Sequence, residues 1–261
     1  MKISRSPGYY DACIKKNNNT IERRENEVKN FVPNPLNDVM PGRPSNESII
    51  ASNKLVTFSL RLDNLSASFS RGDDLNELRK RFSETVQVMG AVWDKKYVKI
   101  YEGRERKEVD RYYLDHNIQM RWMLALSVLL DVPEEEFTIL YDLVNRDRIK
   151  DALYDYLISY RVPDRELSEK VYPEVPFNNI RVILVEENKA QCEAMIKHYL
   201  EKEWLKTYKN TGWAKAHLYP EEKYSFFGMW AFEVAAIVKI KGLDDHSFRD
   251  HIHYPDRLLH K

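Results

Sequence analysis

The stretch from residue 224 to 245 constrains the fold of this chain more than any other segment. Aromatic residues and Gly228 open it, an apolar run from Trp230 to Val238 follows, and Gly242 closes it. A run with so little polar interruption is typical of a buried helix. Gly242 followed by Leu243 fits the left-handed stop of a Schellman motif. The segment therefore predicts a loop, a buried helix from about Phe227 to Lys241 and a defined helix end.

Composition and charge favour a folded, helix-rich protein that does not bind nucleic acid directly. The chain has 261 residues, enough for one large or two small domains, with 43% hydrophobic residues and only 8 glycines. Lysine plus arginine and aspartate plus glutamate both number 41, so the formal net charge is zero. Generic nucleic-acid binders are usually clearly basic, and this balance argues against that class.

The two halves of the chain differ in charge. Residues 131–261 hold 24 acidic and 19 basic side chains, so residues 1–130 hold 41 − 24 = 17 acidic and 41 − 19 = 22 basic ones. The simpler interpretation is ordinary variation in solvated charge. The functional interpretation is an acidic face that binds a basic partner, and both interpretations stay open at this point.

Several signals favour a reduced, cytoplasmic protein without a membrane span. Cys13 and Cys192 are too few for a disulfide framework and form no C-x-x-C motif. The N-terminal residues contain no apolar core of a signal peptide. The longest apolar run, 122–130, is too short to cross a bilayer and fits a buried helix.

Apolar spacing and helix-terminus chemistry predict an all-α fold. Pro33, Pro35 and Pro41 form a loop, Gly72 ends a helix, and Asp74 with Glu77 has the spacing of a capping box. Strand and hairpin signals are nearly absent. We therefore expect a multi-helix bundle or a solenoid-like stack of antiparallel helix pairs. The expected helices cover about 9–32, 45–70, 74–98, 105–131, a helix that opens at 132, one capped by Asp147 that runs to 160, 178–208 and 227–241.

Glu233 lies inside the apolar run of the last helix. A carboxylate there is costly unless it is hydrogen-bonded or paired. One interpretation is a general acid or base with a raised pKa, and the other is a buried polar anchor that fixes the position of the helix. A single carboxylate without a partner motif favours the structural role.

The C-terminal residues hold histidine and carboxylate side chains in close sequence. His251 and His253 lack the i, i+4 spacing of a helical zinc motif, so helix capping and surface exposure are favoured over metal binding. We predict no metal and no cofactor. The residues of this group are Asp244, Asp245, His246, Asp250, His251, His253, Asp256 and His260.

Two sets of side chains are candidates for binding a protein partner. Trp122 and Trp230 lie on apolar faces and are expected in the core, whereas Trp204, Tyr208, Trp213 and Tyr219 lie where a helix gives way to a polar loop. Glu134, Glu135 and Glu136 either stabilise a helix N-terminus or, with Asp142, form an acidic binding surface. No phosphate-binding glycine loop, nucleophile elbow or paired cysteine site occurs in the sequence.

The C-terminal signature, residues 226–255, resembles that of the PoNe immunity family (PoNi-like). The family pattern is close to Y-F-G-Y-W-S-F-E-A-A-A-x-x-K-x-x-G-x-D-D with a later Tyr-Pro. The match is imperfect over 253–258, and no sharp motif matches before residue 130. The residues that carry the resemblance are Phe227, Gly228, Trp230, Phe232, Glu233, Ala235, Ala236, Lys239, Gly242, Asp244, Asp245, Tyr254 and Pro255.

The resemblance implies a cytoplasmic, all-α immunity protein and not an enzyme. Its partner would be a cognate nuclease toxin of the PD-(D/E)xK class, often delivered by a type VI secretion system, whose DNA-binding or active-site cleft it occludes. We expect a helical region over 1–130, a helical domain over 131–261, and a monomer or homodimer. No direct nucleic-acid or membrane partner is expected.

Two alternatives come from other functional classes. The first is a helical protein-interaction scaffold without a toxin partner. The second is a metal-dependent hydrolase that uses Glu233 or the C-terminal histidine and aspartate residues. Function resides in sites and not in folds, so the helical pattern alone does not separate these alternatives.

Overall fold

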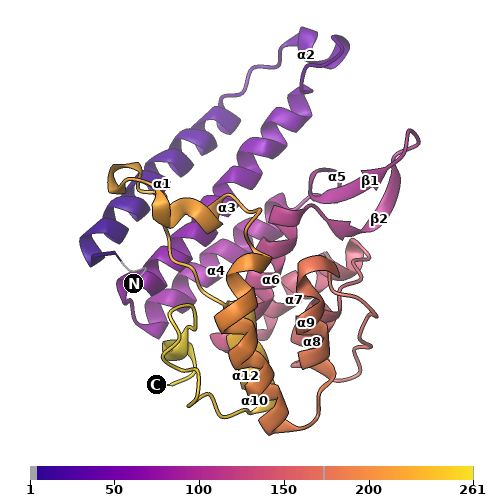
Figure 1. Cartoon of the computed structure of the whole chain (residues 1–261). Coiled ribbons are helices and arrows are strands. Elements are labelled where there is room, and N and C mark those ends of the chain that lie inside the picture. The colour runs from indigo at the N-terminus through magenta and orange to yellow at the C-terminus, as the bar shows by residue number, and fades with distance from the viewer. Residues whose placement is uncertain (1–4, 173, 261) are drawn as a thin grey trace.

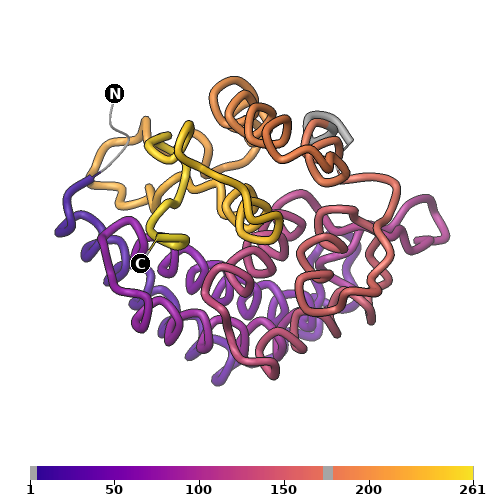
Figure 2. Tube along the Cα trace, turned by 90° about the horizontal axis from the view of Figure 1, so that it is seen from below, coloured from indigo at the N-terminus to yellow at the C-terminus, as the bar shows by residue number. Residues whose placement is uncertain are grey.

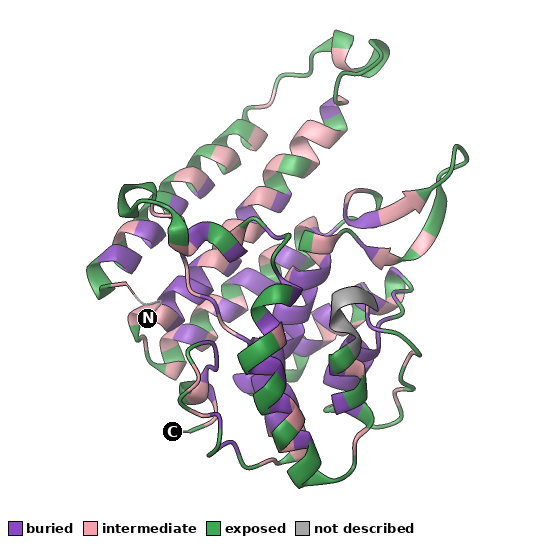
Figure 3. Ribbon diagram, in the orientation of Figure 1, coloured by how far each residue is buried: buried purple, intermediate pink, exposed green. Residues whose placement is uncertain are grey.

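The structure is a computed structural model that describes residues 5–172 and 174–260, and the side chains of 174–178 lie outside the description. The described chain is 64% helical, with 12 α-helices and one small two-stranded sheet. The predicted helical fold is thus confirmed. The helices surround a core that Figure 3 shows at the centre of the molecule, where α6 and α12 meet.

An N-terminal layer is built from three long helices: α1 (Pro7–Lys29), α3 (Asn46–Arg71) and α4 (Leu75–Val92). α1 and α3 pack against each other, and the short α2 (Pro35–Val39) lies at the far tip of this pair (Figure 1). Ser45 and Asp74 accept hydrogen bonds from backbone amides as N-caps, and Gly72 ends α3 with a φ of 106°. The loop across the prolines is therefore interrupted by one helical turn that we did not predict.

Residues 99–112 form a β-hairpin, whereas the sequence predicts a helix from about residue 105 onward. After α5 (Lys95–Val98), strand β1 (Lys99–Glu102) pairs antiparallel with β2 (Lys107–Tyr112). Gly103 and Arg106 both have positive φ, 73° and 50°, which turns the chain back. The helix predicted from 105 begins only at α6 (Leu114–Leu129).

α6 is the central helix, and its residues from 120 to 129 are all buried. α7 (Glu134–Arg146) and α8 (Ala152–Ser159) pack against it, and α12 (Phe232–Lys241) covers its remaining side. The prediction that Asp147 caps the helix now seen as α8 is wrong, and Asp151 is its N-cap. Asp147 instead follows the last residue of α7, and its side chain accepts a hydrogen bond from the Tyr112 hydroxyl. The last helix also starts later than predicted, at Phe232, since 226–231 are non-helical.

The helix predicted over 178–208 is divided into several pieces. α9 (Glu174–Val185) ends before Asn188, which caps α10 (Lys189–His198); a π-helical turn at Tyr199–Glu203 and α11 (Trp204–Thr207) follow. The 3-10 turns Trp213–Leu218, Glu221–Lys223 and Asp256–Leu258 complete the chain. Figure 2 shows the C-terminal helices and tail on one side of the N-terminal layer.

None of the helices in the described residues is both long enough and apolar enough to span a bilayer.

Candidate functional site

Glu233 is fully buried and is held by two aromatic donors from α11 and the turn after it. Its Oε1 accepts the Trp204 Nε1–H at 2.8 Å and the Tyr208 hydroxyl at 2.7 Å. Burial raises the pKa of Glu233, and the nearby Arg121 guanidinium opposes that rise. The carboxylate thus joins α12 to the segment that follows the π-helical turn.

Arg121 extends this polar network to the opposite side of the core. It donates to Asn117 Oδ1 and to the Tyr172 carbonyl, each at 3.0 Å, and lies 3.9 Å from Asp151. Asp151 in turn caps α8 and accepts the Tyr172 amide at 2.9 Å. Burial raises the pKa of Asp151 as well, again opposed by Arg121. Sequence patterns alone did not place Arg121 or Asp151 in this network.

The expectation that Trp204 and Tyr208 lie on the surface is wrong. Both side chains have no solvent exposure. The polar loop after residue 208 suggested that both aromatic side chains are exposed. Instead, both donate hydrogen bonds to Glu233, which is distant in sequence and buried in the core. Trp213 is half-buried and Tyr219 is exposed, so these two remain accessible.

The first part of the signature fastens the C-terminal segment to α3. The Phe227 carbonyl accepts the hydroxyls of Ser66 at 3.0 Å and Ser70 at 2.8 Å, and Trp230 Nε1 donates to Ser70 Oγ at 2.7 Å. Gly228 has a φ of 111°, and a Cβ there would overlap with Ser70 Oγ and Trp230 Nε1. Glycine at 228 is therefore required by both conformation and space.

The second part of the signature fixes α12 and its end. Phe232 is buried and lies edge-on to Trp122, while Lys239 donates to the Val128 carbonyl at 2.8 Å and to Asp131 at 2.7 Å. Gly242 has a φ of 58°. Its amide donates to the Lys239 carbonyl, and the Leu243 amide donates to the Val238 carbonyl, which is the predicted Schellman pattern. Phe232 and Lys239 thus attach α12 to α6, and Gly242 ends the helix.

Among the C-terminal histidines and aspartates, Asp245 and His260 contact each other. The Asp245 carboxylate accepts from Arg249 at 2.6 Å, His260 at 2.7 Å and Tyr254 at 3.2 Å. Burial works against the charged form, but the bonds from His260 and Arg249 prevail and lower the pKa of Asp245. Asp244 caps the turn at His246, and Pro255 is buried.

His253 is buried beside Trp204 and shares a 3.0 Å hydrogen bond with the Met229 carbonyl. Burial lowers the pKa of His253 to about 4. Over 5–172 and 174–260, no three histidine, cysteine or acidic side chains gather as they would around a metal ion.

The acidic residues of α7 are only partly available to a partner. Glu135 and Asp142 are exposed, Glu134 is exposed but pairs with Arg161 at 2.9 Å, and Glu136 is buried. α7 begins near the C-terminal end of α6, whereas Trp213 lies near residues 115–122 of α6. The residues that line a cavity with Trp213 and Tyr219 include none of these acidic residues of α7.

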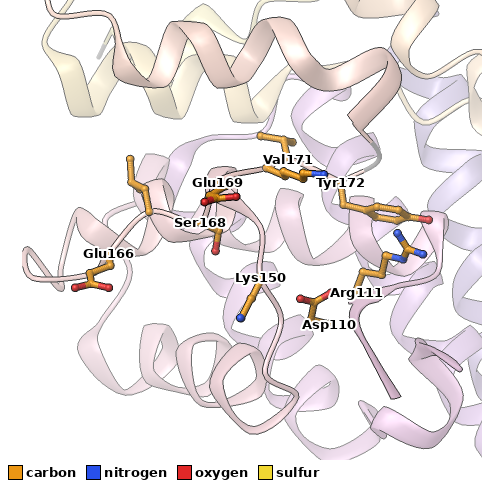
Figure 4. A pocket seen from close by; sticks show the side chains of 10 residues that line it. Asp110, Arg111, Lys150, Glu166, Ser168, Glu169, Val171 and Tyr172 are labelled. Atoms are coloured by element: carbon orange, nitrogen blue, oxygen red, sulfur yellow. The ribbon is translucent and has the colours of Figure 1, made fainter. Parts of the chain in front are cut away.

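Trp213 and Tyr219 instead line a cavity of about 320 Å³ together with residues of α3 and α6. Two of those residues, Asp63 and Asp115, carry carboxylates, which sequence spacing did not single out because they come from separate helices. A larger cavity of about 580 Å³ lies beside β2 and the 166–172 loop (Figure 4). Its charged lining residues balance: Asp110, Glu166 and Glu169 against Arg111, Lys150 and Lys170.

Comparisons with known proteins cover nearly the whole chain. Residues 3–141 match the model of the N-terminal part of PoNe immunity proteins (PoNi), and residues 149–258 match that of the C-terminal part. Protein PA2201 from Pseudomonas aeruginosa, a crystal structure, has a similar fold, with a TM-score of 0.60 and 21% identity over 96% of this chain and 86% of that one. A search of curated proteins found no match. The chain belongs to the PoNe immunity protein (PoNi) family, whose members are immunity proteins against a nuclease toxin.

Proposed function

We propose that this protein binds its cognate PoNe-type nuclease and inhibits it by covering the DNA-binding or active-site cleft. The observation that carries the proposal is the match of both PoNi models, over 3–141 and 149–258. Inhibition by binding needs no reaction by the immunity protein itself, and we assign it none. The nuclease would be a DNase of the PD-(D/E)xK class delivered by a type VI secretion system, and the complex would form in the cytoplasm.

The contacts of the signature residues support separate roles for the core and the surface, since several of these residues are buried. Phe232 and Glu233 act inside the fold, and Gly228 is fixed by its neighbours. The exposed residues are then free to differ between family members without loss of the fold. A partner surface is accordingly sought among accessible side chains, of which Glu134, Glu135, Asp142, Trp213 and Tyr219 are the predicted ones.

Charge supports the type of partner. A DNase must attract phosphate groups, so its DNA-binding cleft is basic. Residues 131–261 of this chain hold 24 acidic against 19 basic side chains, a difference of five. Complementary charge speeds association and disfavours wrong partners.

The proposal is tested with the PoNe-type nuclease that we propose as the partner. Both proteins are purified separately, their affinity is measured by calorimetry, and cleavage of linear DNA is followed with increasing amounts of the immunity protein. We expect a dissociation constant on the order of nanomolar and loss of cleavage at a one-to-one ratio, as for other tight inhibitors. Undiminished cleavage at a tenfold excess of the immunity protein would refute the proposal.

A further inference from the structure

The cavity of about 320 Å³ lies where the two family-matched segments meet. α3 and α6 contribute one side, and the segment 212–227 contributes the other. All of its lining residues belong to the described chain. The residues used below are Asp63, Asp115, Gln119, Trp122, Trp213 and Tyr219.

Several polar groups of the lining residues have no protein partner. Gln119 Nε2 donates to Ser59 at 2.8 Å, but its Oε1 is buried without a hydrogen bond, as is the Ser225 hydroxyl. Within the described part of the chain, the Asp63 carboxylate makes no hydrogen bond or ion pair, although the side chain is partly buried. Burial raises the pKa of Asp63 to about 7. A partly buried carboxylate without a cation favours a site that a partner completes.

Aromatic rings form the walls around these acceptors. The rings of Trp122 and Trp213 lie 5.2 Å apart, and Tyr219, 43% exposed, lies at the edge. Lys223 lies over the Tyr219 ring at 4.8 Å. The Trp213 ring also packs against Tyr208 at 5.1 Å and Trp204 at 6.0 Å, and its half-buried side chain still lines the cavity. Aromatic faces attract cations, and tryptophan attracts them most strongly.

We propose that this cavity receives an arginine side chain of the cognate nuclease, with Asp63 as its carboxylate partner and Trp213 as its stacking surface. The inference rests on the proposed function. A planar guanidinium matches the combination of carboxylate, amide oxygen and indole better than a lysine ammonium, since it carries five donors and stacks on aromatic rings. DNA-binding proteins use such arginines to contact phosphates, so capture of one would compete directly with DNA.

The first test measures nuclease affinity for the Asp63→Asn variant. The substitution keeps the size of the side chain and removes only its charge. Because Asp63 has no hydrogen-bond or ion-pair partner among the described residues, the variant is expected to fold with an unchanged or higher melting temperature. We expect affinity to fall at least tenfold. Glu84→Gln is the matched control, since Glu84 is an exposed carboxylate on α4 outside the cavity, and its affinity is expected to match the wild type.

The outcomes separate the two proposals. If the wild type binds the nuclease and Asp63→Asn binds it equally well, the arginine inference is overturned while the proposed function stands. If the wild type does not bind the nuclease, both are overturned. Tenfold or greater loss confined to Asp63→Asn supports the inference.

A second test needs no nuclease. N-acetyl-arginine amide is titrated into the wild-type protein while the indole N–H resonances of Trp122 and Trp213 are followed by NMR, with N-acetyl-citrulline amide as the uncharged analogue. We expect saturable shifts with the arginine probe only, and none in Asp63→Asn. Equal shifts with both probes, or no shift with either, would overturn the inference.

Discussion

Gly228→Ala should destabilise this protein severely, although it adds a single methyl group. Gly228 has a φ of 111°, a conformation that residues with a Cβ rarely adopt. The new Cβ would also overlap with Ser70 Oγ and Trp230 Nε1 and would approach Trp230 Cδ1 to 2.8 Å. Ser70 and Trp230 are hydrogen-bonded to each other, so neither can move without breaking the attachment of the C-terminal segment to α3.

The magnitude follows from three contributions. A residue held in an unfavourable backbone region costs about 1–3 kcal/mol. Forcing an extra methyl group into a packed site costs about 1–3 kcal/mol. Loss of the hydrogen bond between Trp230 and Ser70 adds about 0.5–1.5 kcal/mol. We expect a loss of about 3–6 kcal/mol, against a total stability of about 5–15 kcal/mol for a typical protein.

Urea unfolding at 25 °C, followed by circular dichroism, measures this loss. The matched control is Gly8→Ala, because Gly8 lies in the first turn of α1 and no atom stands within 4 Å of its added Cβ. That variant is expected to gain about 0.5–1 kcal/mol from improved helix propensity. If Gly228→Ala unfolds within about 1 kcal/mol of the wild type, the strain and overlap argument is refuted.

Two further predictions concern the buried polar groups. Glu233→Leu should lower the free energy of unfolding by about 3–5 kcal/mol, because it leaves the buried Trp204 and Tyr208 donors without their acceptor and removes a carboxylate near the Arg121 charge. Glu233→Gln keeps an acceptor and should lose less, and comparison of the two urea midpoints tests this. Because burial lowers the folded-state pKa of His253 to about 4, the unfolded state binds more protons, and stability should fall as pH drops from 6.5 towards 4. The shift corresponds to at most about 3 kcal/mol, and His253→Asn should flatten the melting temperature over this pH range, while an unchanged slope would contradict the assignment.

Helix ends were predictable because their chemistry is local. Ser45, Asp74 and Gly242 each act within a few residues of their own position, through a side-chain acceptor or a left-handed conformation. The helical fold and the family resemblance of residues 226–255 could be predicted because both depend on such short-range patterns. The division into 1–130 and 131–261 stays a prediction.

The hairpin over 99–112 was not predictable from the same rules. Val109, Tyr112 and His116 have helical spacing, and the turn carries charged residues in place of the usual Asn-Gly pair. Pairing of β1 with β2 and burial of Tyr112 in the core outweigh that local preference. Likewise, Asn188 is the cap that marks the break before α10, and the charged residues around it are otherwise typical of one continuous helix.

The site residues depend on contacts between distant segments. From the sequence, Trp204 and Tyr208 were predicted to lie on the surface. Their burial depends on hydrogen bonds to Glu233, which belongs to another helix. Asp63 and Trp213 are 150 positions apart in sequence, and no periodicity connects them. From the sequence alone, candidate residues could be predicted by type. Which of them lie together in one cavity depends on how α3, α6 and the 212–227 segment pack.

The closure of α12 over α6 has a genetic consequence. One side of the central helix is covered by α12, because Phe232 packs on Trp122 and Lys239 binds the Val128 carbonyl. A nonsense codon at position 232 would leave Trp122 and its neighbours facing water, even though most of the polypeptide had been made. Such an allele would behave as a complete loss of protection, and late frameshifts would be selected against as strongly as early ones.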